Sequence, residues 1–201
     1  MAQCRMTTPP FLEALGAGGP AADRAGKMDL YGWLVGSWDL DVTQYPEDGV
    51  RRRRKGEWHF GWALEGRAIQ DVWIVPPRGE LRHGDAAANV NSYGTTLRVY
   101  DVRINAWQIQ WTYPVTQNFL HMIGRKSGDD IVQLGTRPDG NLTRWSFSEI
   151  TPNSFRWQGE ISADEERPGV STSNSSPGVS RSPRLCSSNV ILRTEPVARS
   201  P

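Results

Sequence analysis

Cysteine is scarce in this chain: of 201 residues only Cys4 and Cys186 are cysteines, and both lie in segments that we expect outside the folded core. The sequence therefore gives no support to a disulfide framework, which favours a reducing, cytoplasmic setting. Long apolar runs are missing as well, since none reaches the length of a membrane-spanning helix. The N-terminus lacks the basic region, apolar stretch and cleavage site of a secretory signal. We therefore expect a protein that is neither exported nor held in a membrane.

An excess of one charge is also absent. The chain has 23 lysines and arginines against 22 aspartates and glutamates, which leaves a net charge of +1. Such a balance creates no overall field that would draw in nucleic acid or an anionic membrane, so we expect neither as a partner. The basic run from Arg51 to Lys55 is interpreted as a solvated hairpin end, with a phosphate contact as the alternative. The sequence leaves the oligomeric state open, a homodimer included.

The motifs of the common cofactor and hydrolase classes are missing too. The sequence has no glycine loop for phosphates, no serine nucleophile elbow, no paired-cysteine motif and no His-Glu-x-x-His metal helix. We therefore expect no metal and no cofactor. Haem bound through a histidine is an alternative. His59 falls on a polar face and His83 in a polar connection, which leaves His121 as the candidate ligand.

Tryptophan, by contrast, is abundant, and all nine tryptophans lie between Trp33 and Trp157. Around them apolar side chains alternate with polar ones, which is typical of strands with one buried face. We predict strands at Ser37 to Tyr45, Glu57 to Trp62, Ala68 to Val75, Tyr93 to Tyr100, Trp107 to Tyr113, Asn118 to Ile123, Asp130 to Gly135, Arg144 to Phe147 and Phe155 to Ile161.

Turn-forming residues separate these segments, and no helix lies between them. The sequence therefore predicts an all-β fold, an antiparallel up-and-down β-barrel, with a sandwich as the alternative. A short helix from Met28 to Val35, ended by Gly36, precedes the first strand. The predicted organisation is a disordered leader at 1–26, the barrel at 27–162, and a disordered or frame-shifted tail at 163–201.

Two runs carry a resemblance to a known family: Trp33 to Trp38, which opens the first strand, and Trp62 to Arg67, which follows another. They resemble the DUF1579 family of lipocalin-like proteins, over about Met28 to Ile161. The resemblance implies a calycin-type barrel in which the tryptophan of Gly36-Ser37-Trp38 plugs the barrel base. It implies no particular reaction, because the family has no agreed activity.

Members of that family end in a strand that closes the barrel. The C-terminal part of this sequence lacks the pattern of such a strand. After Ile161 the residues Ser, Pro, Arg, Gly and Thr dominate, and no alternation survives. We therefore expect the closing strand to be missing. A reading-frame slip near Glu166 is one hypothesis for its loss, and the nucleotide sequence decides it.

The polar face of each strand should meet water and the aromatic face should line the barrel interior. We therefore predict binding of a small, largely apolar molecule, as in a carrier or sensor, with a fully packed interior as the alternative. Polar residues that share an inward face are added as ligand contacts. The candidate ligand-binding residues are Trp58, Trp62, Trp73, Tyr93, Thr95, Trp107, Trp111, Tyr113, His121, Trp145, Glu149 and Trp157.

An enzymatic alternative uses two of the polar side chains that we expect to face inward. Asp71 and His121 would form an acid–base pair for a cofactor-free isomerase or cyclase, since a carboxylate beside an imidazole in a dry cavity can exchange protons. Two structural interpretations compete with it. Asp71 can instead pair with Arg98 or Arg67, and His121 can be a hydrogen-bonded core residue.

Overall fold

The computed structural model describes residues 8–45, 50–81, 91–162 and 186–193. Helices α1 (Pro10–Leu15) and α2 (Ala25–Gly32) come first, separated by the two-residue strand β1 (Gly16–Ala17) and the 3-10 turn η1 (Ala22–Arg24). A second such turn, η2 (Arg78–Glu80), follows the fourth strand. The longer strands of the described residues are β2 (Gly36–Gln44), β3 (Arg52–Ala63), β4 (Ala68–Val75), β5 (Ser92–Asp101), β6 (Ala106–Tyr113), β7 (Asn118–Ser127), β8 (Asp130–Thr136), β9 (Leu142–Ser148), β10 (Ser154–Ser162) and β11 (Cys186–Arg193).

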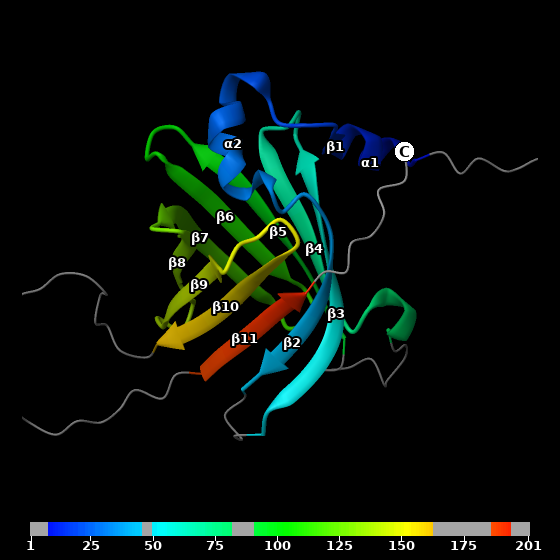
Figure 1. Cartoon of the computed structure of the whole chain (residues 1–201), viewed down its shortest axis with the longest axis vertical. Coiled ribbons are helices and arrows are strands. Elements are labelled where there is room, and N and C mark those ends of the chain that lie inside the picture. Colours follow the sequence, from blue (N-terminus) through cyan, green and yellow to red (C-terminus); the bar gives the residue numbers. More distant parts are fainter. Residues whose placement is uncertain (1–7, 46–49, 82–90, 163–185, 194–201) are drawn as a thin grey trace, which may run out of the picture.

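Strands β2 to β10 form one curled sheet in which each strand is antiparallel to the next in chain order. This meander confirms the predicted all-β, up-and-down fold and excludes a sandwich of two sheets. The helix α2 lies over one end of the curled sheet (Figure 1). It ends at Gly32, and the first strand begins at Gly36, close to the predicted boundaries.

The tail contributes a strand that the sequence did not lead us to expect. β11 pairs with β10 on one side and with β2 on the other, so that Val190 stands opposite both Trp157 and Val42. It therefore lies between the first and last strands of the meander (Figure 1). These pairings correct the expectation that the closing strand is missing. The rest of the tail, at 163–185 and 194–201, lies outside the described residues, and the frame-slip hypothesis still depends on the nucleotide sequence.

The leader also has more structure than predicted. β1 pairs with the end of β3, at Ala63 and Trp62, and the amide of Leu64 donates to the carbonyl oxygen of Leu15 at 3.0 Å. Arg67, just after β3, forms an ion pair with Asp23 at 2.7 Å. These long-range contacts order residues 8–26 although their own sequence has little periodicity, so the expected disorder of this segment is corrected.

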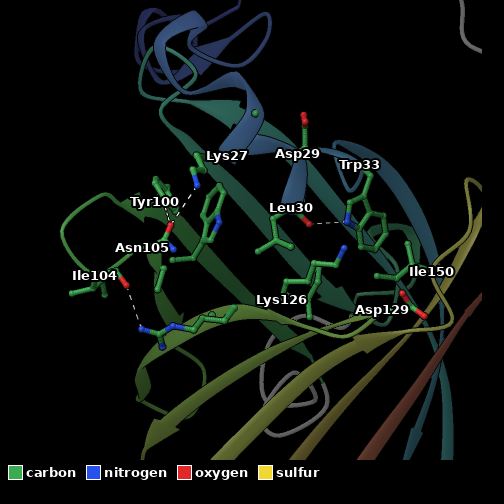
Figure 2. Close-up of a pocket in the computed structure, with 16 residues that line it drawn as sticks. Lys27, Asp29, Leu30, Trp33, Tyr100, Ile104, Asn105, Lys126, Asp129 and Ile150 are labelled. Atoms are coloured by element: carbon green, nitrogen blue, oxygen red, sulfur yellow. Dashed lines mark hydrogen bonds between the residues drawn. The ribbon is translucent and has the colours of Figure 1, made fainter.

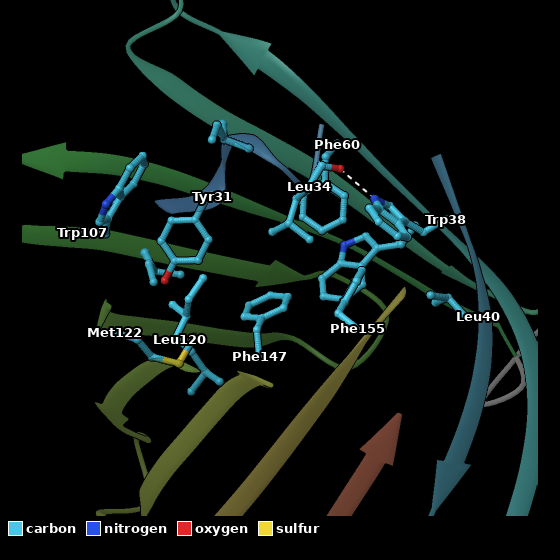
Figure 3. Packing of buried hydrophobic residues seen from close by; sticks show 14 of the residues in the cluster. Tyr31, Leu34, Trp38, Leu40, Phe60, Trp107, Leu120, Met122, Phe147 and Phe155 are labelled. Atoms are coloured by element: carbon cyan, nitrogen blue, oxygen red, sulfur yellow. Dashed lines mark hydrogen bonds between the residues drawn. The ribbon is translucent and has the colours of Figure 1, made fainter. Parts of the chain in front are cut away.

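The packed core occupies the end of the barrel beneath α2. Met28, Tyr31 and Leu34 have no exposed surface. Tyr31 and Leu34 point into this end of the barrel (Figure 3). The Tyr31 ring meets Trp107 edge-on, with the centroids 4.9 Å apart, and the Trp38 indole N–H donates to the carbonyl oxygen of Leu34 at 2.7 Å. No side chain caps the N-terminus of α2 within the described residues. The helix is therefore held mainly by burial, which is worth about 25 cal/mol per Å² of apolar surface.

We expect Val190→Pro to accelerate amide hydrogen exchange in β2 and β10, because proline in the middle of a strand removes a ladder hydrogen bond. Amides of β6, across the ring from β11, should keep their protection and serve as the internal control. Exchange measured by mass spectrometry on the full chain checks this. Unchanged protection in β2 and β10 would show that β11 does not close the sheet in solution.

Candidate functional site

Six aromatic side chains on the inner faces of the strands are only half-buried; one of them, Trp62, packs against Gly32 at the α2 end, and the other five lie elsewhere. These five stand towards the barrel end remote from α2, and we call them the aromatic chamber: Trp73, Trp111, Tyr113, Trp145 and Trp157. On β9 and β10 the inner-face residues nearer α2, Phe147 and Phe155, are almost fully buried. The interior is thus packed beneath the helix and less completely filled at the other end.

Ring contacts across the barrel place these side chains inside it. Trp73 of β4 and Trp157 of β10 have ring centroids 5.9 Å apart, and Trp111 of β6 lies 5.7 Å from Trp145 of β9. Neither pair belongs to neighbouring strands, so the rings meet only through the interior. Trp145 also lies 5.3 Å from Trp157 and so joins the two pairs. The predicted inward face of β6, β9 and β10 is confirmed.

Two glycines make room for these indoles. A Cβ at Gly94 would lie 2.4 Å from the six-membered ring of Trp111, and one at Gly159 would lie 2.7 Å from that of Trp157. Real Cβ atoms do not approach other atoms so closely, so each indole occupies the space that a side chain at the glycine position would need. The chamber wall therefore depends on the glycines of β5 and β10 as well as on the tryptophans.

The polar side chains of the interior include several that have no partner. Among the described residues, the interior atoms buried without a hydrogen bond are Trp58 Nε1, Trp157 Nε1, Thr96 Oγ1, Arg98 Nε and Nη2, Asn118 Oδ1 and Gln133 Oε1. Trp58 stands on the inner face of β3, with its ring centroid 4.9 Å from that of Trp73 and 6.1 Å from that of Trp157. It therefore separates the chamber from the packed core.

An ion pair is enclosed at the same level of the barrel. Asp71 of β4 accepts a hydrogen bond from Arg98 of β5, and neither side chain has exposed surface. The other carboxylate oxygen accepts from the amide of Thr96 at 3.0 Å. The Arg98 guanidinium lies 5.4 Å from the ring centroid of Phe60 and 5.5 Å from that of Tyr31. Aromatic faces and a carboxylate thus compensate the buried cation, and burial raises the pKa of Tyr31 well above its ordinary range.

This pair corrects the predicted face of β5. The inner face carries Gly94, Thr96, Arg98 and Tyr100, whereas Tyr93 is 42% exposed and Thr95 lies on the outer side. We had assigned the opposite face because Leu97 and Val99 are more apolar. The structure confirms the alternative in which Asp71 pairs with Arg98.

The predicted acid–base pair does not form. Asp71 lies inside the barrel, whereas His121 is exposed on the outer face of β7 and its Nε2 lies 2.7 Å from Gln108 Oε1. The inner face of β7 instead carries Leu120 and Met122. The assignment of β7 was wrong because Phe119, which is 53% exposed, and the partly buried Ile123 make the outer face look buried. The same finding removes His121 as an interior haem ligand.

The remaining predicted residues divide between the core and the surface. Trp107 is buried beneath α2, and Trp62 packs against Gly32 at the same end. Glu149 is exposed at the end of β9 and pairs with Arg156 at 3.0 Å, so its expected inward position is corrected. Sequence reasoning missed Arg98, Thr96 and Asn118 as interior polar groups. For Arg98 and Thr96 the signal was the carboxylate of Asp71, which both contact and which is distant along the chain; Asn118 had no such signal.

The outer surface carries a second polar cluster, formed by Ser37, Glu57, His59 and Arg78. Ser37 Oγ lies 2.9 Å from His59 Nδ1, and His59 Nε2 lies 2.8 Å from Glu57 Oε2. Arg78 donates to Glu57 from Nε at 2.9 Å and from its backbone amide at 2.7 Å. The hydrogen bond from the Arg78 side chain, above all, lowers the pKa of Glu57 from 4.5 to about 2. We interpret the cluster as structural: its hydrogen bonds hold the segment after β4 against β3.

An open groove lies between α2 and the rim of the barrel (Figure 2). It encloses about 930 Å³, and its apolar lining includes Leu30, Trp33 and Ile131. Lys126 and Asp129 border it, and the Trp33 indole N–H donates to the carbonyl oxygen of Leu30 at 2.9 Å. The groove is separate from the chamber, because the packed core lies between them.

No family model matches the chain, and no curated protein does so either. Within the described residues, no three His, Cys, Asp or Glu side chains stand close enough to share a metal ion. None of the described helices has the length and apolar character needed to cross a membrane.

We expect Asp71→Asn to destabilise the protein by about 3 kcal/mol, because the buried Arg98 cation would lose its counter-charge. The double variant Asp71→Asn with Arg98→Met should recover much of that loss, since no uncompensated charge remains. Urea unfolding followed by tryptophan fluorescence measures both. A double variant no more stable than the single one would show that the pair contributes by shape and not by charge.

Glu57→Gln should lower the free energy of unfolding by about 1 kcal/mol at pH 7, since it breaks a charge-assisted pair with Arg78. The folded-state pKa of Glu57 lies below its unfolded value, so this contribution is complete above about pH 4.5 and is lost as the pH falls towards 2. Urea unfolding across this range gives the measurement. Glu80→Gln, on exposed η2, is the control, and a Glu57→Gln effect that does not change with pH would contradict the assignment.

Proposed function

We propose that the protein binds a small, largely apolar molecule inside the barrel, between the side chains of the aromatic chamber. The observation that carries the proposal is the half-buried state of five inward aromatic side chains, at an end of the barrel where no helix packs in the described part of the chain. Large aromatic rings that contact one another only through the interior offer wide apolar surfaces to a guest. A guest that filled the remaining space would complete their burial.

The chemistry of the chamber favours binding over catalysis. The only interior carboxylate among the described inner-face residues is Asp71, and Arg98 and the amide of Thr96 already engage both of its oxygen atoms. A general acid or base needs a group that is free to exchange a proton with the substrate. A carrier or sensor needs only a pocket of fitting shape, which supports that function here. The resemblance of Trp33 to Trp38 and Trp62 to Arg67 to the DUF1579 family is likewise kept as a proposal.

Trp145→Ala should weaken binding of the neutral fluorophore N-phenyl-1-naphthylamine at least tenfold, because Trp145 joins the two halves of the chamber wall. Leu134→Ala, on the exposed face of the adjacent strand, removes a similar apolar side chain and should leave the affinity unchanged. Fluorescence titration of the dye, with energy transfer from tryptophan, measures both affinities. Equal affinities would contradict the proposal.

The groove beside α2 supplies the competing location for the dye. Leu30→Ala alters the lining of that groove and leaves the chamber residues in place. If the dye binds in the chamber, its affinity for the Leu30→Ala variant should equal that for the unmodified protein. A loss of binding in Leu30→Ala together with full binding in Trp145→Ala would assign the ligand site to the groove.

A further inference from the structure

The unpaired polar atoms next to the chamber define what its ligand must offer. Two of them, Trp58 Nε1 and Trp157 Nε1, are indole nitrogens that can only donate a hydrogen bond. The Trp58 side chain is 2% exposed, and the two rings meet edge-to-face with centroids 6.1 Å apart. A buried donor without an acceptor costs about 1–3 kcal/mol, so a ligand atom that accepts from either indole recovers a cost already present in the folded protein.

The remaining unpaired interior atoms agree with this requirement in part: Arg98 Nε and Nη2 can only donate, whereas Gln133 Oε1, opposite Trp145, can only accept. The Thr96 hydroxyl can donate as well as accept, so it is compatible with the same ligand oxygen. Asn118 Oδ1 only accepts, but it stands at the first residue of β7, at the end of the strand remote from α2. Trp58 and Thr96 lie deeper in the barrel than Asn118. Their unpaired groups can therefore donate hydrogen bonds to the end of a ligand that lies deepest in the barrel.

The charges of the interior argue against an anionic ligand. Arg98 is already paired with Asp71, so this level of the barrel has no net charge. Arg54, on the inner face of β3 towards the open end, donates to the carbonyl oxygen of Val75 at 3.4 Å, and burial lowers its pKa. A carboxylate taken to the depth of the unpaired indoles would lose its hydration, which is costly in an apolar surrounding, and Arg54 stands nearer the open end than this level.

We propose that the ligand is a planar, uncharged molecule with a conjugated ring system and a carbonyl oxygen at its buried end. The oxygen accepts from the indole N–H groups of Trp58 and Trp157, and the ring system lies between the aromatic side chains of the chamber. This inference rests on the proposed function, since it names the class of molecule for the same chamber. In this proposal the tryptophan rings provide most of the binding affinity, and the two indole N–H groups provide the selectivity for a carbonyl group.

The test compares two ligands of nearly equal shape. 2-Acetylnaphthalene carries the carbonyl oxygen, and 2-isopropenylnaphthalene replaces that oxygen with a CH₂ group. We expect the ketone to bind the full-length protein about tenfold more tightly, the effect of one to two hydrogen bonds at about 1 kcal/mol each. In ¹⁵N-labelled protein the ketone should move the indole proton signals of Trp58 and Trp157 downfield, and the hydrocarbon should not.

Matched variants separate the hydrogen bonds from the shape of the pocket. Trp157→Phe keeps an aromatic ring but removes the N–H, so it should reduce the ratio of ketone to hydrocarbon affinity at least threefold. Trp33→Phe makes the same replacement outside the chamber, beside α2, and should leave that ratio unchanged. The indole N–H signals of Trp58 and Trp157 in the unmodified protein test the same two hydrogen bonds without any mutation.

The outcomes distinguish this inference from the function on which it rests. Equal affinity for ketone and hydrocarbon would overturn the carbonyl assignment and leave binding in the chamber intact. Tighter binding of 2-naphthoate than of the ketone would overturn the uncharged class and point to Arg54 as the anchor. If neither naphthalene binds, and the fluorescent dye does not bind either, the proposed function itself fails.

Discussion

The ion pair between Asp71 and Arg98 is the constraint on which the interior of the barrel depends. A buried cation needs a carboxylate and enclosing aromatic faces, and for Arg98 of β5 these come from β3, β4 and α2. The pair fixes which face of β5 points inward, since a one-residue shift would place Arg98 in water and leave Asp71 alone in the core. With Arg98 inside, Gly94 and Thr96 must also face the interior. The apolar Leu97 and Val99 are then left on the outer side.

The pair also marks where close packing gives way to the chamber. Towards α2, Tyr31 and Phe147 fill the space beside Arg98, and the helix seals that end. Away from α2, Gly94 replaces a side chain, and the indole of Trp111 lies over it. A glycine on an inner face leaves space that a side chain would otherwise fill, and the six-membered ring of a tryptophan occupies that space. Glycine and tryptophan together therefore shape the chamber, and neither would do so alone.

How far the sequence predicted this arrangement depended on the contrast between the two faces of each strand. In β3 and β6 aromatic residues alternate with Glu57, His59 and the glutamines at 108 and 110, so the inward face was predicted correctly. In β5 and β7 both faces carry apolar residues. The inward face of β5 holds Arg98, which is satisfied by Asp71 of β4, and local alternation cannot detect that compensation, so the sequence places Tyr93 and Thr95 inside. In β7 the apolar Phe119 and Ile123 lie on the outer face, so the sequence places His121 inside. The same reasoning explains the leader and β11, whose order comes from backbone pairing with strands far along the chain.

The unpaired indole nitrogens are the feature of the interior that supports the proposed binding site over an imperfectly packed core. Burying Trp58 could have been achieved with phenylalanine, which brings similar contacts and no donor to satisfy. A tryptophan at this position leaves an N–H without an acceptor, a cost that close packing alone gives no reason to retain. Local departures from the rules of stable packing concentrate at functional sites, because there the missing partner is supplied by something outside the chain. The two donors lie beside half-buried aromatic rings and beside strand positions where glycine leaves space for an indole. These three features of the interior favour a bound ligand at the same place.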